Sequence, residues 1–187
     1  MGVTKYDGYL ICMTLIALSV CVGCGYHLRA DGNPVGIEIK GLAIPLMEST
    51  SSVEGFEADF TGIIRDEFIS HARVPLVPEE EADKVLRGKI YDISAQPLTY
   101  SVQQRELSGR LITHETTSIR RLKIRLDISL LDRDSGKVIW TEDSMEEEAR
   151  FEVGSDPLVN RYNQQQALLR IARQLAKRVY LKTMERF

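Results

Sequence analysis

RLKIRLDISLL, which spans Arg121 to Leu131, decides the fold class of this chain. Apolar residues occupy every second position of the stretch, and charged or small polar residues lie between them. Successive side chains of a β-strand point to opposite faces, so the pattern predicts a half-buried strand with one apolar and one charged face. A sheet with one apolar face buries that face against another layer, which here must come from elsewhere in the chain.

The segments around this strand predict further strands. The sequence DRDSGK (132–137) is typical of a hairpin turn, after which residues 138–142 return antiparallel and the acidic residues beyond them continue toward Val153. Residues 35–44 alternate in the same way, and residues 85–95 predict a second long strand. The apolar residues of 96–117 follow neither the helical nor the strand period, so we expect a long loop or a loose hairpin extension there.

Two segments have helical spacing. Ser51 and Glu54 resemble a capping box, and the apolar residues after them predict an amphipathic helix over 53–72. Asp156 and Pro157 suit an N-cap and a first helical position, which predicts a helix over 158–185. The buried stripe of this second helix is expected to comprise Leu168, Ile171, Leu175 and Val179. We therefore predict an α+β fold, a two-layer sandwich in which a mostly antiparallel sheet of about four strands carries two helices on one face.

An uncharged apolar run extends from Tyr9 to Gly23 and ends at Cys24. The run is short for a membrane-spanning helix, which needs roughly 20 apolar residues, and it suits the core of a signal peptide. The end of the run resembles the lipobox of bacterial lipoproteins, in which a small residue precedes the cysteine that is acylated. This resemblance implies a lipoprotein signal peptide at 1–23, a lipidated tether at 24–34 and a single α+β domain at 35–187. An uncleaved amino-terminal anchor is the alternative.

Composition argues against several classes of function. The chain has 24 basic and 27 acidic side chains, and a net charge of −3 argues against a nucleic-acid partner. All three cysteines (Cys12, Cys21 and Cys24) lie at or before the predicted cleavage site, so the mature chain has no thiol for a disulfide or a nucleophile. No catalytic motif and no metal-ligand spacing is present, and Asp132 to Gly136 suits a plain turn better than a calcium loop. We expect no enzyme, no metal and no cofactor.

Arg121, Lys123 and Arg125 form a basic row along the predicted strand. A spacing of two places all three on one strand face. The row is either an ordinary solvated sheet face or a cradle for phosphate or carboxylate groups, which guanidinium groups bind through paired hydrogen bonds.

Four stretches of the chain, CGYHLR (24–29), ADKVLRGKI (82–90), LDRDSGKVIW (131–140) and NQQQALLRIARQLAKRV (163–179), can be compared with known families. Together they resemble the lipopolysaccharide-assembly lipoprotein family, LptE. CGYHLR (24–29) is similar to the start of the mature family members, and ADKVLRGKI (82–90) to the entry of their central strand. LDRDSGKVIW (131–140) is similar to the family's hairpin, and NQQQALLRIARQLAKRV (163–179) to its last helix. The four stretches occur in the order that the family has.

The resemblance implies a function in the outer membrane of a Gram-negative cell. Family members sit inside the large β-barrel LptD, support its assembly, plug it and contact lipopolysaccharide. Basic residues at the approach to the last helix are implicated in that contact, and Arg161 matches this place. The expected partners are an LptD-type barrel, lipopolysaccharide and, through Cys24, the periplasmic side of the outer membrane. The alternatives are a lipid-tethered envelope module that binds another protein and a tethered periplasmic enzyme.

Overall fold

A computed structural model describes residues 38–51, 53–72, 74–107 and 110–184, with the backbone alone for residues 100–117. The predicted signal peptide, Cys24 and the tether lie outside the described residues. Residues 35–37 and 185–187, at the ends of the predicted domain, do so as well.

Within these described residues the sheet has five strands, in the order β1-β3-β4-β5, and β2 also pairs with β3. The three long strands are β3 (Lys84–Leu107), β4 (Arg110–Asp132) and β5 (Val138–Glu152), and they pair antiparallel. The two-residue strands β1 (Leu42–Ala43) and β2 (Glu48–Ser49) run parallel to β3. The sheet is therefore mixed, and its antiparallel part is formed by two successive hairpins.

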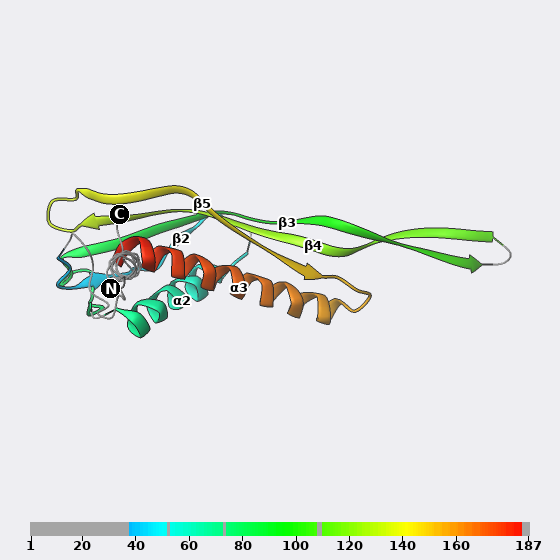
Figure 1. Ribbon diagram of the computed structural model, residues 1–187, viewed down its shortest axis with the longest axis horizontal. Coiled ribbons are helices and arrows are strands. Elements are labelled where there is room, and N and C mark those ends of the chain that lie inside the picture. The colour runs from blue at the N-terminus through cyan, green and yellow to red at the C-terminus, as the bar shows by residue number, and fades with distance from the viewer. Residues whose placement is uncertain (1–37, 52, 73, 108–109, 185–187) are drawn as a thin grey trace, which may run out of the picture. The chain divides into compact units, whose positions relative to one another are not determined.

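Both helices, α2 (Phe56–His71) and α3 (Pro157–Met184), lie on the same face of this sheet (Figure 1). The other face carries no helix among the described residues. The predicted α+β class and the two-layer arrangement are confirmed, with five strands in place of about four.

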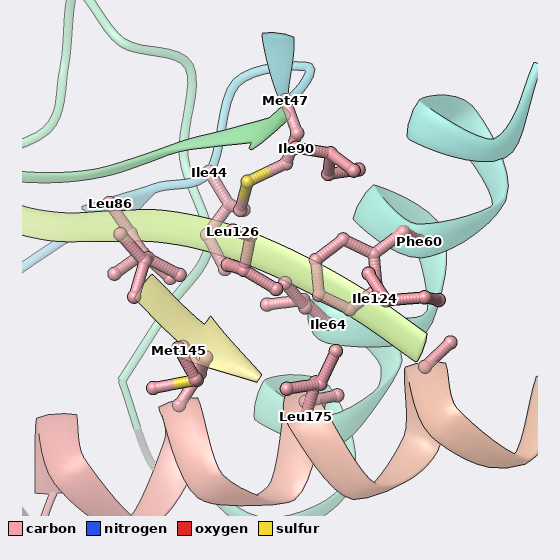
Figure 2. Packing of buried hydrophobic residues seen from close by; sticks show 14 of the residues in the cluster. Ile44, Met47, Phe60, Ile64, Leu86, Ile90, Ile124, Leu126, Met145 and Leu175 are labelled. Carbon is pink, nitrogen blue, oxygen red and sulfur yellow. The ribbon is translucent and has the colours of Figure 1, made fainter. Parts of the chain in front are cut away.

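The buried core lies between the two layers. Each apolar residue of β4 that faces the helices is at most 1 % exposed: Leu122, Ile124, Leu126, Ile128 and Leu130. Figure 2 shows Ile124 and Leu126 among side chains from both helices, including Ile64 of α2 and Leu175 of α3. Of the predicted stripe on α3, Ile171, Leu175 and Val179 are fully buried and Leu168 is half-buried. The apolar residues at every second position of β4 and those at helical spacing on α3 therefore pack in one core.

The predicted strand at 35–44 is wrong for residues 38–41, and residues 35–37 lie outside the described residues. Residues 38–41 form no strand, and only Leu42 and Ala43 pair with β3. The backbone N–H groups of Lys40 and Gly41 donate hydrogen bonds to the Asp83 carboxylate, at 3.3 and 3.0 Å. Because a side chain satisfies these donors, the segment needs no neighbouring strand.

The capping box at Ser51 and Glu54 is also wrong. Helix α2 begins at Phe56, and its N-cap is Gly55, which has a φ of 83° and provides no side-chain cap. A left-handed φ suits glycine because glycine lacks a Cβ atom. The turn that this residue makes sets the start of α2 three residues later than the spacing predicted.

Residues 96–117 form a hairpin extension rather than a loop. The β3–β4 register continues from Lys84↔Asp132 to Leu107↔Arg110, with irregularities near Pro97 and Thr99. Strand β5 pairs with β4 only over residues 119–131, so beyond that point β3 and β4 pair with each other alone. Backbone hydrogen bonds propagate along a ladder without an apolar period, and the sequence pattern therefore did not reveal the strands.

Candidate functional site

The basic row of Arg121, Lys123 and Arg125 lies on the face of β4 that points away from both helices. The residues between them, Leu122 and Ile124, are fully buried in the core. The predicted common face of the three cations is therefore present in the structure.

Each cation of the row has an acidic neighbour on an adjacent strand. Lys123 Nζ lies 2.8 Å from Glu146 of β5, and Arg121 lies 3.5 Å from Glu148 of β5. On the other side, Arg125 donates two hydrogen bonds to Asp92 of β3, at 2.9 and 3.2 Å. The row is thus the basic half of a charge-compensated surface.

The register explains why these partners meet. Lys123 lies directly opposite Glu148, and Arg121 lies directly opposite Arg150, yet each cation reaches the glutamate of the diagonal position. Diagonal neighbours on one sheet face lie within reach of long side chains. Arg121 thereby pairs with a carboxylate instead of facing a like charge.

These contacts change the pKa values of two of the paired groups. The hydrogen bond from Lys123 lowers the pKa of Glu146, and the hydrogen bond to Asp92 raises the pKa of Arg125. The Arg125 guanidinium also lies over the Tyr91 ring, 5.7 Å from its centroid. Both shifts favour the charged forms of Glu146 and Arg125.

Arg161 lies in a different layer from the row, near the start of α3. The carboxylate of Asp156 accepts the N–H of Leu158 at 2.8 Å, which confirms the predicted N-cap of this helix. Arg161 is exposed and forms no ion pair with any described residue. The structure therefore does not bring the two groups of predicted site residues into one site.

Sequence reasoning missed an open groove of about 360 Å³ where the end of β5 and the middle of β4 meet α3. Its basic side chains are Arg150 and Arg170, and Ile119 and Phe151 contribute apolar surface. Asn163 of α3 donates a hydrogen bond to the Glu152 carbonyl at 3.0 Å and holds one wall to the other. No sequence spacing relates residues 119, 151 and 170, so the groove had no signal in the sequence.

The described residues contain no group of three His, Cys, Asp or Glu side chains that could hold a metal ion. The turn after β4 is a plain one, in which Asp132 accepts hydrogen bonds from the N–H and the hydroxyl of Ser135, at 2.9 and 2.6 Å. Both oxygens of Asp132 are engaged, since the second accepts from Lys84 at 3.1 Å.

The family model of lipopolysaccharide-assembly proteins, LptE, matches residues 39–183 of this chain. The match covers most of the chain and spans the whole sheet and both helices. The chain belongs to the LptE family. The LptE match confirms the resemblance inferred from the four sequence stretches, and it places the protein in lipopolysaccharide assembly in the cell envelope.

Solved structures share the fold of this LptE family member at low identity. Uncharacterized lipoprotein B of Nitrosomonas europaea is 13 % identical over 86 % of this chain and 90 % of its own, with a TM-score of 0.50. A protein of Xanthomonas campestris is 10 % identical over 85 % of this chain and 94 % of its own, with a TM-score of 0.52. No curated protein sequence matches the chain. Neither described helix is long and apolar enough to cross a membrane.

Proposed function

We propose that this protein is an outer-membrane lipoprotein that plugs an LptD-type β-barrel, supports the assembly of that barrel and binds lipopolysaccharide during its insertion. The observation that carries the proposal is the LptE match, which runs through both layers of the fold. The face of the sheet that carries the basic row and points away from both helices also supports the proposal. A wet, charge-compensated sheet face suits the lumen of a large barrel, because such lumens are polar. The protein acts by binding and not by catalysis.

The proposed role in transport is tested by depleting the protein and following lipopolysaccharide at the cell surface together with the folding of the barrel. Loss of surface lipopolysaccharide and accumulation of misfolded barrel are expected. Normal lipopolysaccharide transport with a normal barrel would contradict the proposal and would favour an envelope module with another partner.

We propose that acyl chains on Cys24 anchor the protein to the periplasmic side of the outer membrane. Each buried methylene contributes about 0.8 kcal/mol, so more than one chain gives stable anchoring. Gly25 follows the cysteine where an inner-membrane retention signal would have Asp. Metabolic acyl labelling with membrane fractionation tests this anchor. Cys24→Ala should abolish the label, and label that persists in this variant would place the acylated residue elsewhere.

We propose two separate candidates for the residues that bind the phosphate groups of lipopolysaccharide. One is the row of Arg121, Lys123 and Arg125, and the other is Arg161. Because each cation of the row is paired with an acid, replacing the three cations alone also leaves three acids unpaired. The matched variant therefore neutralises the acids instead: Asp92→Asn, Glu146→Gln and Glu148→Gln. If the row binds phosphate, neutralising the cations should weaken lipopolysaccharide binding and neutralising the acids should strengthen it.

Lipopolysaccharide binding is measured for each variant across a salt series, because salt screens contacts between exposed charges. The comparison of variants separates the basic row from Arg161 as the binding site. Arg161→Gln is compared with Lys137→Gln, which removes an exposed cation from the turn after β4. Reduced binding with Arg161→Gln alone would make the row a barrel contact or an ordinary sheet face. Unchanged binding in all of these variants would remove both candidates from the lipid site.

A further inference from the structure

One edge of β4 is free over residues 110–117. Strand β5 pairs with β4 as far as Glu152 and Ile119, and a last hydrogen bond runs from the Val153 N–H to the Ser118 carbonyl at 2.9 Å. Beyond that point β4 pairs with β3 alone among the described residues. Figure 1 shows these two strands running on past the end of β5. This free edge of β4 therefore presents backbone N–H and C=O groups without a neighbouring strand.

Strand β5 stops because the chain turns away from β4. The side-chain amide of Asn160 exchanges two hydrogen bonds with the backbone of Gly154, at 2.7 and 2.9 Å. These bonds hold the bend between β5 and α3, which begins at Pro157. The limit of the β4–β5 ladder is thus set by the departure of β5 and not by the end of β4.

The other edges of the described sheet are protected. Side chains of α3 donate hydrogen bonds to two carbonyl groups of β5. One bond runs from Arg178 to the Glu146 carbonyl at 2.7 Å, and the other runs from Asn163 to the Glu152 carbonyl at 3.0 Å. Strands β1 and β2 are two residues long, and β3 beyond them contains Pro97 with register irregularities beside it. Short edges, proline and irregular register all oppose the addition of a further strand.

The free edge of β4 has none of these features. Its register with β3 is continuous from Tyr100↔Thr117 to Leu107↔Arg110. Residues 110–117 contain no proline and no glycine, and four of the eight are β-branched, which favours extended backbone. A ribbon of two strands is marginally stable in water and gains stability from a third. The free edge is therefore a regular template for an added strand.

The groove between β5 and α3 opens at the base of this edge. Two of the residues that line it, Ile119 and Glu152, are the last pair of the β4–β5 ladder. Its two guanidinium groups, those of Arg150 and Arg170, are exposed and form no ion pair with a described residue. Glu152 is the one acidic residue among those that line the groove. The groove keeps a net positive charge, which suits a carboxylate of an incoming segment.

We propose that the free edge of β4 accepts an extended segment of the barrel protein as an added antiparallel strand. Strand addition to an exposed sheet edge is a common mode of peptide recognition, in which main-chain hydrogen bonds supply the affinity. The antiparallel direction matches both existing neighbours of β4 and gives the more stable ladder. The added strand continues the line of β5, so its amino-terminal end lies at the groove, where an acidic side chain binds Arg150 and Arg170.

This inference rests on the proposed barrel partner, and two observations favour that partner over a second copy of the chain. The free edge belongs to the strand that carries the basic row, so a barrel that surrounds the outer sheet face also surrounds the edge. A symmetric antiparallel pair of two such edges would place Arg110 of a second copy beside residue 117, near Arg150 and Arg170. Like charges would then meet at the groove, which is unfavourable.

Hydrogen exchange of single backbone amides tests the added strand. The full chain alone is compared with its complex with the purified LptD-type barrel. Successive residues of a strand direct their N–H groups to alternate edges, so every second amide of 110–117 should exchange fast in the free protein. In the complex these fast amides should become slow, and the alternation should disappear. A contact made through side chains alone would leave the alternation in place.

Proline substitution separates main-chain pairing from other contacts at the same edge. Of the neighbouring variants Thr113→Pro and His114→Pro, one removes an N–H from the free edge and the other removes an N–H that faces β3. Exchange in the free protein shows which is which. The free-edge variant should keep the β3–β4 ladder and lose the protection that the barrel adds. The other variant is the matched control and should open the ladder without the barrel.

The groove is tested separately. Arg150→Gln with Arg170→Gln should weaken the protection that the barrel adds on the order of tenfold, the loss expected when a hydrogen bond to a charged group is removed. Arg173→Gln with Lys177→Gln is the matched control, since it removes two other exposed cations of α3. This control should leave the protection unchanged.

Three outcomes would overturn the proposal. A stable complex in which the fast amides of 110–117 stay fast would remove the added strand and leave the role as a plug intact. Protection that grows with the concentration of the chain alone would assign the edge to a second copy. Absence of any complex with the barrel would contradict the proposed function together with this inference.

Discussion

Met47 occupies the space in which a side chain at Gly88 would lie. A Cβ atom on Gly88 would overlap Met47 Sδ and would also lie 3.3 Å from the Asp127 carbonyl oxygen. Met47 is 2 % exposed and is packed in the core, so it has little room to move aside. Close packing of this kind makes even one added methyl group costly.

Gly88→Ala should therefore lower the free energy of unfolding by about 1–3 kcal/mol, the usual cost of overpacking a core. Urea denaturation followed by Trp140 fluorescence measures the change. Met47→Ala combined with Gly88→Ala should recover part of the overlap cost relative to the sum of the two single variants. Strict additivity of the two changes would contradict the proposed contact.

Gly62 provides the opposite case within α2. A Cβ atom there would meet no atom within 4 Å. Gly62→Ala should raise the free energy of unfolding by about 0.5–1 kcal/mol, because alanine loses less backbone entropy than glycine in a helix. A loss of stability in the same urea assay would mean that this helical position has a packing role.

Asp156→Ala should weaken the start of α3. The variant removes the hydrogen bond from the Leu158 N–H to the Asp156 carboxylate, and a lost N-cap costs about 0.5–2 kcal/mol. Hydrogen exchange should show faster opening in the first turns of α3, with little change near Leu175 in the core. Asp156→Ser should restore most of the protection, since serine also caps helices well.

The ion pairs of Lys84 should make stability depend on pH at both extremes. Lys84 Nζ lies 3.1 Å from both Asp83 and Asp132. Burial by itself would lower the pKa of Lys84, but the two carboxylates outweigh burial and raise it. The pKa of Asp132 is lowered, chiefly by hydrogen bonds from Ser135 and then from Lys84. Burial would raise the pKa of Asp83, but hydrogen bonds from Gly41, Lys40 and Lys84 lower it.

A lowered aspartate pKa contributes stability that is present above its ordinary value of 3.8 and is lost as the pH falls below it. A raised lysine pKa contributes stability that is present below its ordinary value of 10.5 and is lost as the pH rises through the raised value. Urea unfolding as a function of pH should show both losses. Lys84→Gln should remove the alkaline loss and reduce the acid loss, whereas Lys137→Gln should change neither.

Leu126→Ala should destabilise the protein by about 2–5 kcal/mol, because Leu126 is fully buried between the sheet and the helices. Lys123→Ala, on the opposite face of the same strand, should cost much less, since exposed ion pairs contribute little. Equal losses from the two variants would contradict the assignment of one buried and one solvated face to β4.

The sequence alone determined the features that depend on local spacing. The alternation from Leu122 to Leu130 predicted the central strand and its buried face, and Asp156 with Pro157 predicted the start of the second helix. Such features depend on residues a few positions apart, whose geometry follows directly from the strand or helix period. The family resemblance was also readable at this level, because it rests on contiguous stretches.

The tertiary structure decided which residues meet across strands and layers. Only the register of β4 with β3 and β5 places Asp92, Glu146 and Glu148 beside the basic row, so each cation of the row has an acidic neighbour that the sequence pattern did not reveal. In residues 38–41, where a strand was predicted, hydrogen bonds to the Asp83 carboxylate take the place of strand pairing. Gly55 sets the start of α2. The paired residues lie far apart in sequence, and the start of α2 depends on one backbone torsion of Gly55. Hydrophobic periodicity contains no information about either feature.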